Sequence, residues 1–313
     1  MKKVSFVIPC YRSANTIGVV VDEIRDTMST LPEYDYEIIL VNDCSPDNTF
    51  DVISALARSD GRIIAVDLAK NFGQHAALMS GISHSTGDFV VCLDDDGQTP
   101  ANEVGKLLAR LEQDDCDVAM ASYEHKQHSA FRNFGTKLNN RMTEIMLGKP
   151  RDLSMTSYFA IKRFVVDEML KYKNCFPYLD GLILRCTRRI RTVPVQHRAR
   201  MEGSSGYTLG KLFALWMDGF TAFSVKPLRL ASIFGALTAF AGFIYTIVII
   251  IKHFIYSDIP TGWSSTMALQ LILGGVILLV LGLVGEYIGR IYMCINAAPQ
   301  YVERSVIRRG DGE

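Results

Sequence analysis

Two long stretches without a charged side chain constrain the fold of this 313-residue chain most strongly. Residues 230–251 contain no Asp, Glu, Lys or Arg in 22 positions, and residues 259–285 contain none in 27. As helices rising about 1.5 Å per residue, each would be about 30–40 Å long, enough to cross the hydrocarbon core of a bilayer. The alternative is a pair of buried core helices, but these are usually shorter. The sequence therefore predicts two transmembrane helices.

Basic side chains beside these stretches predict the orientation of the chain. Lys226 and Arg229 precede the first stretch, and the second is followed by four arginines, Arg290, Arg304, Arg308 and Arg309. Lys and Arg concentrate in the cytoplasmic flanks of membrane spans. We therefore expect a multi-pass protein with both termini in the cytoplasm and a short outside loop between the spans.

Composition excludes two classes of protein. Lys plus Arg and Asp plus Glu both number 33, and this zero net charge argues against a nucleic-acid partner, since such proteins usually carry a basic excess. Hydrophobic residues make up 49% of the chain, too many for a disordered protein.

Short apolar runs alternate with helical patterns in the first 121 residues. Strands are predicted at residues 4–9, 37–41, 62–66, 88–93 and 117–121. Helices are predicted between them, at residues 15–30, 48–58, 74–84 and 102–112. This alternation is typical of a mostly parallel sheet with helices on both faces, whose ligands bind beyond the carboxyl ends of the strands. The first strand lacks a G-x-G-x-x-G and the chain lacks a G-x-x-x-x-G-K-[ST], which disfavours a dehydrogenase and a P-loop NTPase.

Three consecutive carboxylates follow the fourth predicted strand. Because side chains alternate along an extended chain, Asp94 and Asp96 should lie on one side and Asp95 on the other. Two carboxylates, together with phosphate oxygens of a ligand, would make a suitable site for Mg²⁺ or Mn²⁺. The alternative is a solvated acidic turn before the next helix.

A second polar segment, residues 41–49, ends the second predicted strand. Its Asp43 is placed to hydrogen-bond a nucleobase or a ribose. Together, the two segments predict a nucleoside-diphosphate pocket in which a metal ion bridges the diphosphate.

Four stretches of the sequence resemble the family-2 glycosyltransferases with the GT-A fold, namely residues 6–11, 41–49, 70–77 and 94–100. Three more resemble the membrane-anchored branch of that family, the polyprenyl-phosphate glycosyltransferases. These are residues 200–207, which follow an R-x-x-G-x-S-x-Y pattern, and residues 223–229 and 285–292. The resemblance covers nearly the whole chain.

The resemblance and the hydrophobic pattern together divide the chain into four segments. A GT-A domain with a Rossmann-like sheet is expected at residues 1–206, an amphipathic interfacial helix at 207–227, two transmembrane helices within 228–296 and a cytoplasmic tail at 297–313. In the second segment, apolar residues recur at helical spacing: Leu209, Leu212, Phe213, Trp216, Phe220 and Phe223. A core helix is the alternative there.

The sequence departs from the usual pattern of that family at several positions. Arg12 and Ser13 stand where the family usually has Asn-Glu, and Cys44 stands in place of a glycine. In the acidic motif, Asp95 and Gly97 replace Ala and Leu. In residues 200–207, which we call the arginine loop, Gly206 stands before the last tyrosine, where the family commonly has Lys.

The resemblance implies an inverting transfer, by single displacement, from a UDP- or GDP-type nucleotide sugar to a polyprenyl phosphate such as undecaprenyl phosphate. Mg²⁺ or Mn²⁺ would be held by Asp94 and Asp96, with Asp96 the more direct ligand and a catalytic residue. The expected contacts to the nucleotide sugar are Pro9, Tyr11, Asp43, Lys70, Asp94, Asp95 and Gln98.

Residues near the arginine loop are expected to act on the acceptor. The resemblance implies contacts to the acceptor phosphate from Arg198, Arg200, Ser205 and Tyr207, with Arg200 also catalytic. Asp152 is the candidate general base, and a turn or cap carboxylate is the alternative. A phosphate monoester is mostly a dianion at pH 7, so the acceptor needs little proton removal. The other arginines of residues 185–200 fit a solvated surface equally well.

The resemblance places the protein in the bacterial plasma membrane, where a homo-oligomer packed through the spans is expected. Two other functions compete with lipid-linked transfer. A processive polysaccharide synthase is disfavoured, because the chain lacks a Gln-x-x-Arg-Trp motif and further spans. A non-catalytic membrane adaptor is disfavoured by the presence of Asp94, Asp96 and Arg200.

Overall fold

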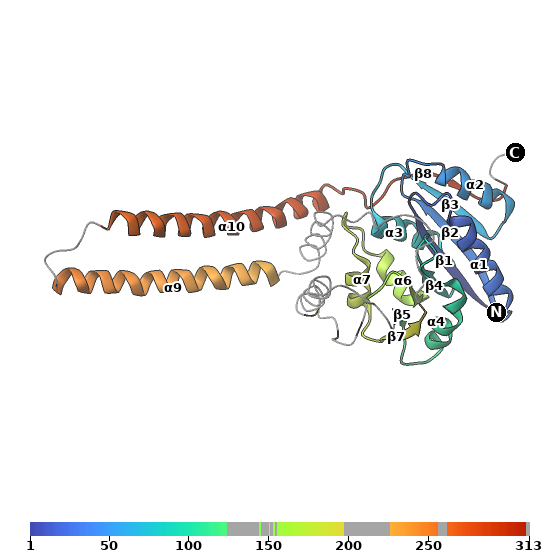
Figure 1. Cartoon of the computed structure of the whole chain (residues 1–313), viewed down its shortest axis with the longest axis horizontal. Helices are drawn as coiled ribbons and strands as arrows, with labels where there is room; N and C mark the ends of the chain where they lie inside the picture. The colour runs from blue at the N-terminus through green and yellow to red at the C-terminus, as the bar shows by residue number, and fades with distance from the viewer. Residues whose placement is uncertain are drawn as a thin grey trace. The chain divides into compact units, whose positions relative to one another are not determined.

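The structure, a computed structural model, describes residues 1–123, 144, 150, 153, 155–196, 226–255 and 262–310. The chain divides into two units (Figure 1). One comprises Met1–Leu212 and Ala297–Glu313, and the other comprises Phe213–Asn296. The boundaries predicted for four segments stay a prediction.

An eight-stranded sheet forms the centre of the first unit (Figure 1). Its strands are β1 (Lys2–Cys10), β2 (Tyr34–Asn42), β3 (Ile63–Leu68), β4 (Phe89–Cys92), β5 (Val118–Tyr123), β6 (Phe159–Lys162), β7 (Ile190–Val195) and β8 (Glu303–Ile307). They lie in the order β7-β5-β6-β4-β1-β2-β3-β8. Because β6 and β8 are antiparallel to their neighbours and the other pairs are parallel, the prediction of a mostly parallel sheet is confirmed.

Helices cover both faces of this sheet. The described helices of the unit are α1 (Ile17–Ser29), α2 (Thr49–Ser59), α3 (Gln74–His84), η1 (Ala101–Glu103), α4 (Val104–Leu111), α6 (Arg163–Leu170) and α7 (Leu179–Cys186). On one face, Phe6 and Ile8 of β1 share a core with α1, α2 and α4. On the other, Val7 of β1 faces Gly81 of α3. The alternating side chains of β1 thus serve two cores, which is why residues 6–10 of this strand are all apolar.

Strand β8 lies within the segment for which the sequence predicts only a tail. It pairs antiparallel with the edge strand β3, and the Ala69 N–H donates to the Val302 carbonyl at 2.8 Å. The chain therefore returns to the sheet after its apolar segment.

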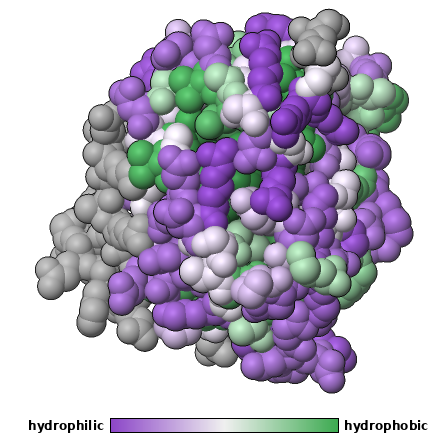
Figure 2. Space-filling view, turned by 90° about the vertical axis from the view of Figure 1, so that its right-hand side faces the viewer, coloured by the Kyte–Doolittle hydropathy of each residue, from purple (hydrophilic) through white to green (hydrophobic). Residues whose placement is uncertain are grey.

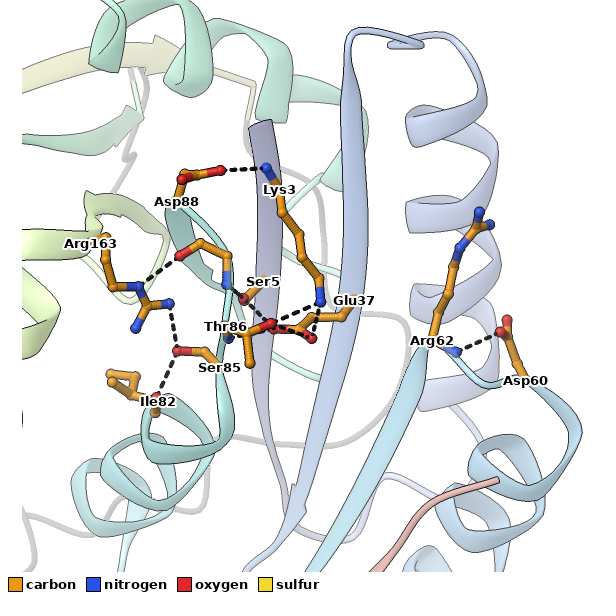
Figure 3. A network of polar contacts seen from close by, with 11 residues as sticks. Lys3, Ser5, Glu37, Asp60, Arg62, Ile82, Ser85, Thr86, Asp88 and Arg163 are labelled. Carbon is orange, nitrogen blue, oxygen red and sulfur yellow. Dashed lines mark hydrogen bonds and ion pairs between the residues drawn. The ribbon is translucent and has the colours of Figure 1, made fainter. Parts of the chain in front are cut away.

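A buried carboxylate joins the amino-terminal ends of three strands (Figure 3). Glu37, which is 7% exposed, accepts hydrogen bonds from Lys3 Nζ and Ser5 Oγ, each at 2.6 Å, and from the Thr86 N–H at 2.6 Å. Burial raises the pKa of Glu37, but these hydrogen bonds outweigh burial and leave the pKa below its ordinary value of 4.5. The ionised form thus stabilises the fold.

Glu37→Gln is expected to lower the free energy of unfolding at pH 7 by about 1–2 kcal/mol, because the charge-assisted hydrogen bonds are weakened. The native pKa of Glu37 is lowered, so its contribution is complete above the unfolded pKa and is lost as the pH falls through the native pKa. Thermal unfolding of the full chain in detergent at pH 7 and pH 4 tests this. The exposed Glu33→Gln is the control, and a difference from wild type that does not shrink at pH 4 would contradict the explanation.

The second unit contains two long helices, α9 (Lys226–Ile255) and α10 (Trp263–Ile295). Among the described residues, one segment is long and apolar enough to cross a membrane: Leu273–Ile295, with 23 residues and a mean hydropathy of 1.7. In α9 the apolar segment Gly235–Tyr245 is shorter. One of the two predicted spans is therefore found by this criterion.

The surfaces of the two units differ in polarity. The face of the first unit shown in Figure 2 is mostly hydrophilic. In the second unit, large apolar side chains are exposed, among them Leu237, Phe240, Phe243, Leu278 and Leu281. Exposed apolar surface of this extent is typical of contact with lipid or with another protein.

Candidate active site

The loops that follow the parallel strands meet at one edge of the sheet, as the sequence predicts. The Asp43 N–H donates to the Cys10 carbonyl at 3.0 Å, which joins the ends of β2 and β1. The Tyr11 N–H donates to Asp95 Oδ2 at 3.0 Å, and the Arg12 N–H donates to Ser45 Oγ at 2.7 Å. The loops after β1, β2 and β4 therefore form one connected site.

The three consecutive carboxylates have different hydrogen-bond partners. Asp95 faces the loop after β1, where Tyr11 is its donor, and burial raises the pKa of Asp95 against the lowering effect of that hydrogen bond. Burial raises the pKa of the Tyr123 hydroxyl, and the charges of Asp94 and Asp96 raise it further. Both charges therefore act on the Tyr123 hydroxyl of β5, and the placement of Asp94 and Asp96 on one side stays a prediction.

Two side chains that the sequence did not single out hold Asp94. Gln74 Nε2 donates to Asp94 Oδ1 at 3.0 Å, and Ser157 Oγ donates to Asp94 Oδ2. Gln74 begins α3, and Ser157 lies just before β6. In the same turn, Asp96 Oδ1 accepts from the Gln98 N–H at 3.0 Å. Donors from three segments thus orient the acidic turn.

Asp43 supports the loop that follows β3. Its two carboxylate oxygens accept hydrogen bonds from the Phe72 N–H at 2.7 Å and from the Gly73 N–H at 2.9 Å. Burial raises its pKa, while these two hydrogen bonds lower it. The loop carries Lys70, whose Nζ lies 4.8 Å from the centre of the Phe72 ring. Asp43 therefore positions the Lys70 loop, a role that its place after β2 does not reveal.

Two residues of the site have left-handed backbones without being glycine. Arg12 has φ 59° and Cys44 has φ 50°, a region that costs about 1–3 kcal/mol for most side chains. These are the positions where the resembling family usually has Asn and Gly, the residues that tolerate this conformation best. Tyr11, 46% exposed, follows Pro9 and Cys10 at the end of β1.

The side chains of the site can be compared with the ligands that a divalent metal ion requires. Among the residues that the structure describes, no group of three or more His, Cys, Asp or Glu side chains surrounds one point. The turn after β4 supplies two carboxylates, Asp94 and Asp96, whose charges both act on the Tyr123 hydroxyl. Such a pair fits a divalent cation whose other ligands are phosphate oxygens and water, as Mg²⁺ commonly has.

Several predicted site residues lie outside the described residues: Asp152, Arg198, Arg200, Ser205 and Tyr207. The predicted amphipathic helix lies there too, so these assignments stay predictions. Two other arginines do have described contacts. Arg189 donates to the Asp114 carbonyl at 3.0 Å, and Arg191 pairs with Asp115 at 3.1 Å. Both lie at the amino-terminal ends of β5 and β7, opposite the acidic turn, which favours the solvated-surface alternative for them.

The family model of glycosyl transferase family 2 matches residues 5–170, which include β2 to β6 and all but the first three residues of β1. The chain belongs to glycosyl transferase family 2. A second family model, described as the GtrB C-terminal hairpin, matches residues 226–291. It covers α9 and most of α10.

Relatives of this family-2 chain are similar over nearly their whole length. The undecaprenyl-phosphate 4-deoxy-4-formamido-L-arabinose transferase of Klebsiella pneumoniae is 32% identical over 312 residues, covering 99% of this chain and 95% of the relative. The protein of the same name from Yersinia enterocolitica is 32% identical over 310 residues, covering 98% and 94%. This chain is therefore a glycosyltransferase.

Several solved structures with a similar fold are those of one enzyme. The glucosyl-3-phosphoglycerate synthase of Mycobacterium tuberculosis, in a complex with Mn²⁺ and UDP-glucose, aligns with a TM-score of 0.51 and 19% identity. The alignment covers 70% of this chain and 77% of the synthase. At this identity the similarity shows a common fold.

Proposed function

We propose that this glycosyltransferase moves a sugar from a nucleoside-diphosphate sugar to a polyprenyl phosphate, with undecaprenyl phosphate as the first candidate acceptor. The observation that carries the proposal is the similarity to undecaprenyl-phosphate sugar transferases over 99% of the chain, through both units. A similarity confined to the first unit would leave the acceptor open.

The donor is proposed to bind at the carboxyl edge of the sheet. Tyr11 and Pro9 would contact the base and Asp43 the nucleoside. Lys70, Asp95 and Gln98 are the other proposed contacts. Asp94 and Asp96 would hold Mg²⁺ or Mn²⁺, which when bound would offset the charge that develops on the departing diphosphate. Gln74 and Ser157 keep the Asp94 carboxylate in place for this task.

The acceptor phosphate is proposed to attack the anomeric carbon with inversion. It is mostly a dianion at pH 7, so the chain has to position it more than to deprotonate it. Arg200 and Arg198 would bind it through charge-assisted hydrogen bonds, with Ser205 and Tyr207 beside them. Asp152 is proposed as the base for the fraction that carries a proton.

The setting proposed for the reaction is the bacterial plasma membrane. Two spans within residues 228–296 would anchor the protein, with the catalytic unit and both termini in the cytoplasm. The helix proposed at 207–227 would lie in the interface, where lipid phosphates are found. A homo-oligomer packed through the spans completes the proposal.

Membranes containing the full chain test the function directly. They are incubated with labelled UDP- and GDP-sugars, Mg²⁺ and undecaprenyl phosphate, and the label is followed into the organic phase. Lipid-soluble label that requires the added lipid and is released by mild acid supports the proposal. Label in an insoluble polymer would instead indicate a polysaccharide synthase. No product from any donor would favour the non-catalytic adaptor.

A further inference from the structure

Strand β8 brings an arginine to the carboxyl end of β3. The pairing of the two strands shifts register between Asp67 and Leu68. Beside this irregularity, the Arg304 guanidinium donates to Asp67 Oδ2 at 3.2 Å and to the Ala69 carbonyl at 3.0 Å. One side chain of the last strand thus holds both the end of β3 and the start of the loop that follows it.

A line of hydrogen bonds leads from Arg304 to the loops of the site. Asp67, which is 3% exposed, accepts through its other oxygen from Asn42 Nδ2 at 2.7 Å. Asn42 Oδ1 in turn accepts from the Ser45 N–H at 3.2 Å, and Ser45 Oγ accepts from the Arg12 N–H at 2.7 Å. Four side chains therefore link β8 to the loops after β2 and β1.

The electrostatics explain why a cation is needed at this point. A carboxylate as deeply buried as Asp67 is costly unless donors or a cation compensate it. Arg304 supplies both through one guanidinium nitrogen, while its other nitrogen binds the Ala69 carbonyl and so fixes the direction from which the cation meets Asp67. Without the guanidinium, Asp67 would reorient toward water, and Asn42 would lose its fixed acceptor.

A separate contact fixes the strand itself. Glu303 accepts from Ser80 Oγ at 2.7 Å and pairs with His84 Nε2 at 3.0 Å, both on α3. Because β8 also has its backbone pairing with β3, its place does not depend on the guanidinium of Arg304. Removing that guanidinium should therefore disturb the hydrogen bonds that connect Asp67 to the loops after β2 and β1, and leave β8 paired with β3.

We propose that Arg304 is a positioning residue for the donor nucleotide, acting through Asp67 and Asn42 on the loops after β2 and β1. The inference rests on the proposed function, since it takes these loops as the nucleotide site. The proposal gives β8, which follows helices α9 and α10 in the sequence, a role in binding the donor.

The test compares Arg304→Gln, Arg304→Lys and wild type as full chains in detergent. Binding of UDP and of GDP, each with Mg²⁺, is measured by calorimetry, and donor KM and kcat are measured in the transfer assay. We expect Arg304→Gln to raise Kd and donor KM about 5–20-fold, with kcat within about twofold. Arg304→Lys should recover part of the loss, because it keeps the charge but not the fork. Arg309→Gln, beyond the end of β8, is the matched control.

A double variant separates positioning from a general loss of stability. If Arg304 acts through Asp67, then Arg304→Gln should weaken nucleotide binding little further in an Asp67→Asn background. Additive losses, or a lower melting temperature with unchanged Kd, would overturn the proposal, as would a change confined to the KM of the lipid. A wild type that binds nucleotide but transfers no sugar to lipid counts against the proposed function alone. A wild type that binds neither nucleotide overturns both.

Discussion

Asp96→Asn is expected to reduce kcat for sugar transfer by about 10²–10³-fold, the usual cost of losing one group that stabilises developing charge. Asn has nearly the same shape but no charge, so the acidic turn should keep its hydrogen bond from the Gln98 N–H. The loss should therefore fall on the metal and the departing diphosphate and leave the fold intact. Transfer assays over a range of Mg²⁺ and Mn²⁺ concentrations measure it.

A matched carboxylate serves as the control for this prediction. Asp115→Asn removes a charge that pairs with Arg110 and Arg191, at the opposite edge of the sheet. It should transfer sugar at close to the wild-type rate. EDTA should abolish wild-type transfer and excess Mg²⁺ restore it. An Asp96→Asn protein that keeps more than about a tenth of wild-type kcat would contradict the role assigned to this carboxylate.

Gly87→Ala is expected to destabilise the first unit by about 2–4 kcal/mol. A Cβ at Gly87 would lie 2.7 Å from the Lys3 carbonyl oxygen and 2.8 Å from the Ser5 nitrogen, both backbone atoms of β1. The Gly87 carbonyl also accepts from Arg163 Nε at 2.7 Å, so the loop has little freedom to move away. Thermal unfolding of the full chain, followed by circular dichroism in detergent, should show a melting temperature lower by about 5–15 °C.

Gly18→Ala is the counterpart of this substitution. A Cβ at Gly18, in the first turn of α1, meets no atom within 4 Å. Alanine favours the helix by up to about 1 kcal/mol over glycine, so this variant should melt at or above the wild-type temperature. Equal melting temperatures for the two variants would show that the close approach at Gly87 is relieved at no cost.

The alternation of strands and helices up to residue 121 could be predicted because each element carries its own pattern. Strand β1 is apolar on both faces from residue 6 to residue 10, and α1 has its apolar residues at helical spacing. Strands β6 and β8 carry no such pattern, because β6 has only four residues and β8 (Glu303–Ile307) contains two charged residues. Their place in the sheet depends on partners far away in the sequence, which no local pattern reveals.

The candidate site was predictable to a similar degree. That Asp94 and Asp96 share one side stays a prediction, but the acidic turn and its place after β4 follow from the local sequence alone. The supports from Gln74 and Ser157 do not, because each joins segments separated by 20 residues or more in the sequence. Polar residues before a helix or a strand usually serve as caps or turns, and only the fold shows that these two converge on one carboxylate.

Strand β8 has a consequence for the order in which the protein is made. It emerges from the ribosome about 240 residues after β3, and the whole apolar hairpin lies between them. At about 5–20 residues per second, β3 waits with an open edge for roughly 10–50 s before β8 is made. Pairing of β8 with β3 is therefore a late folding event, and it closes an edge that would otherwise be available to other strands.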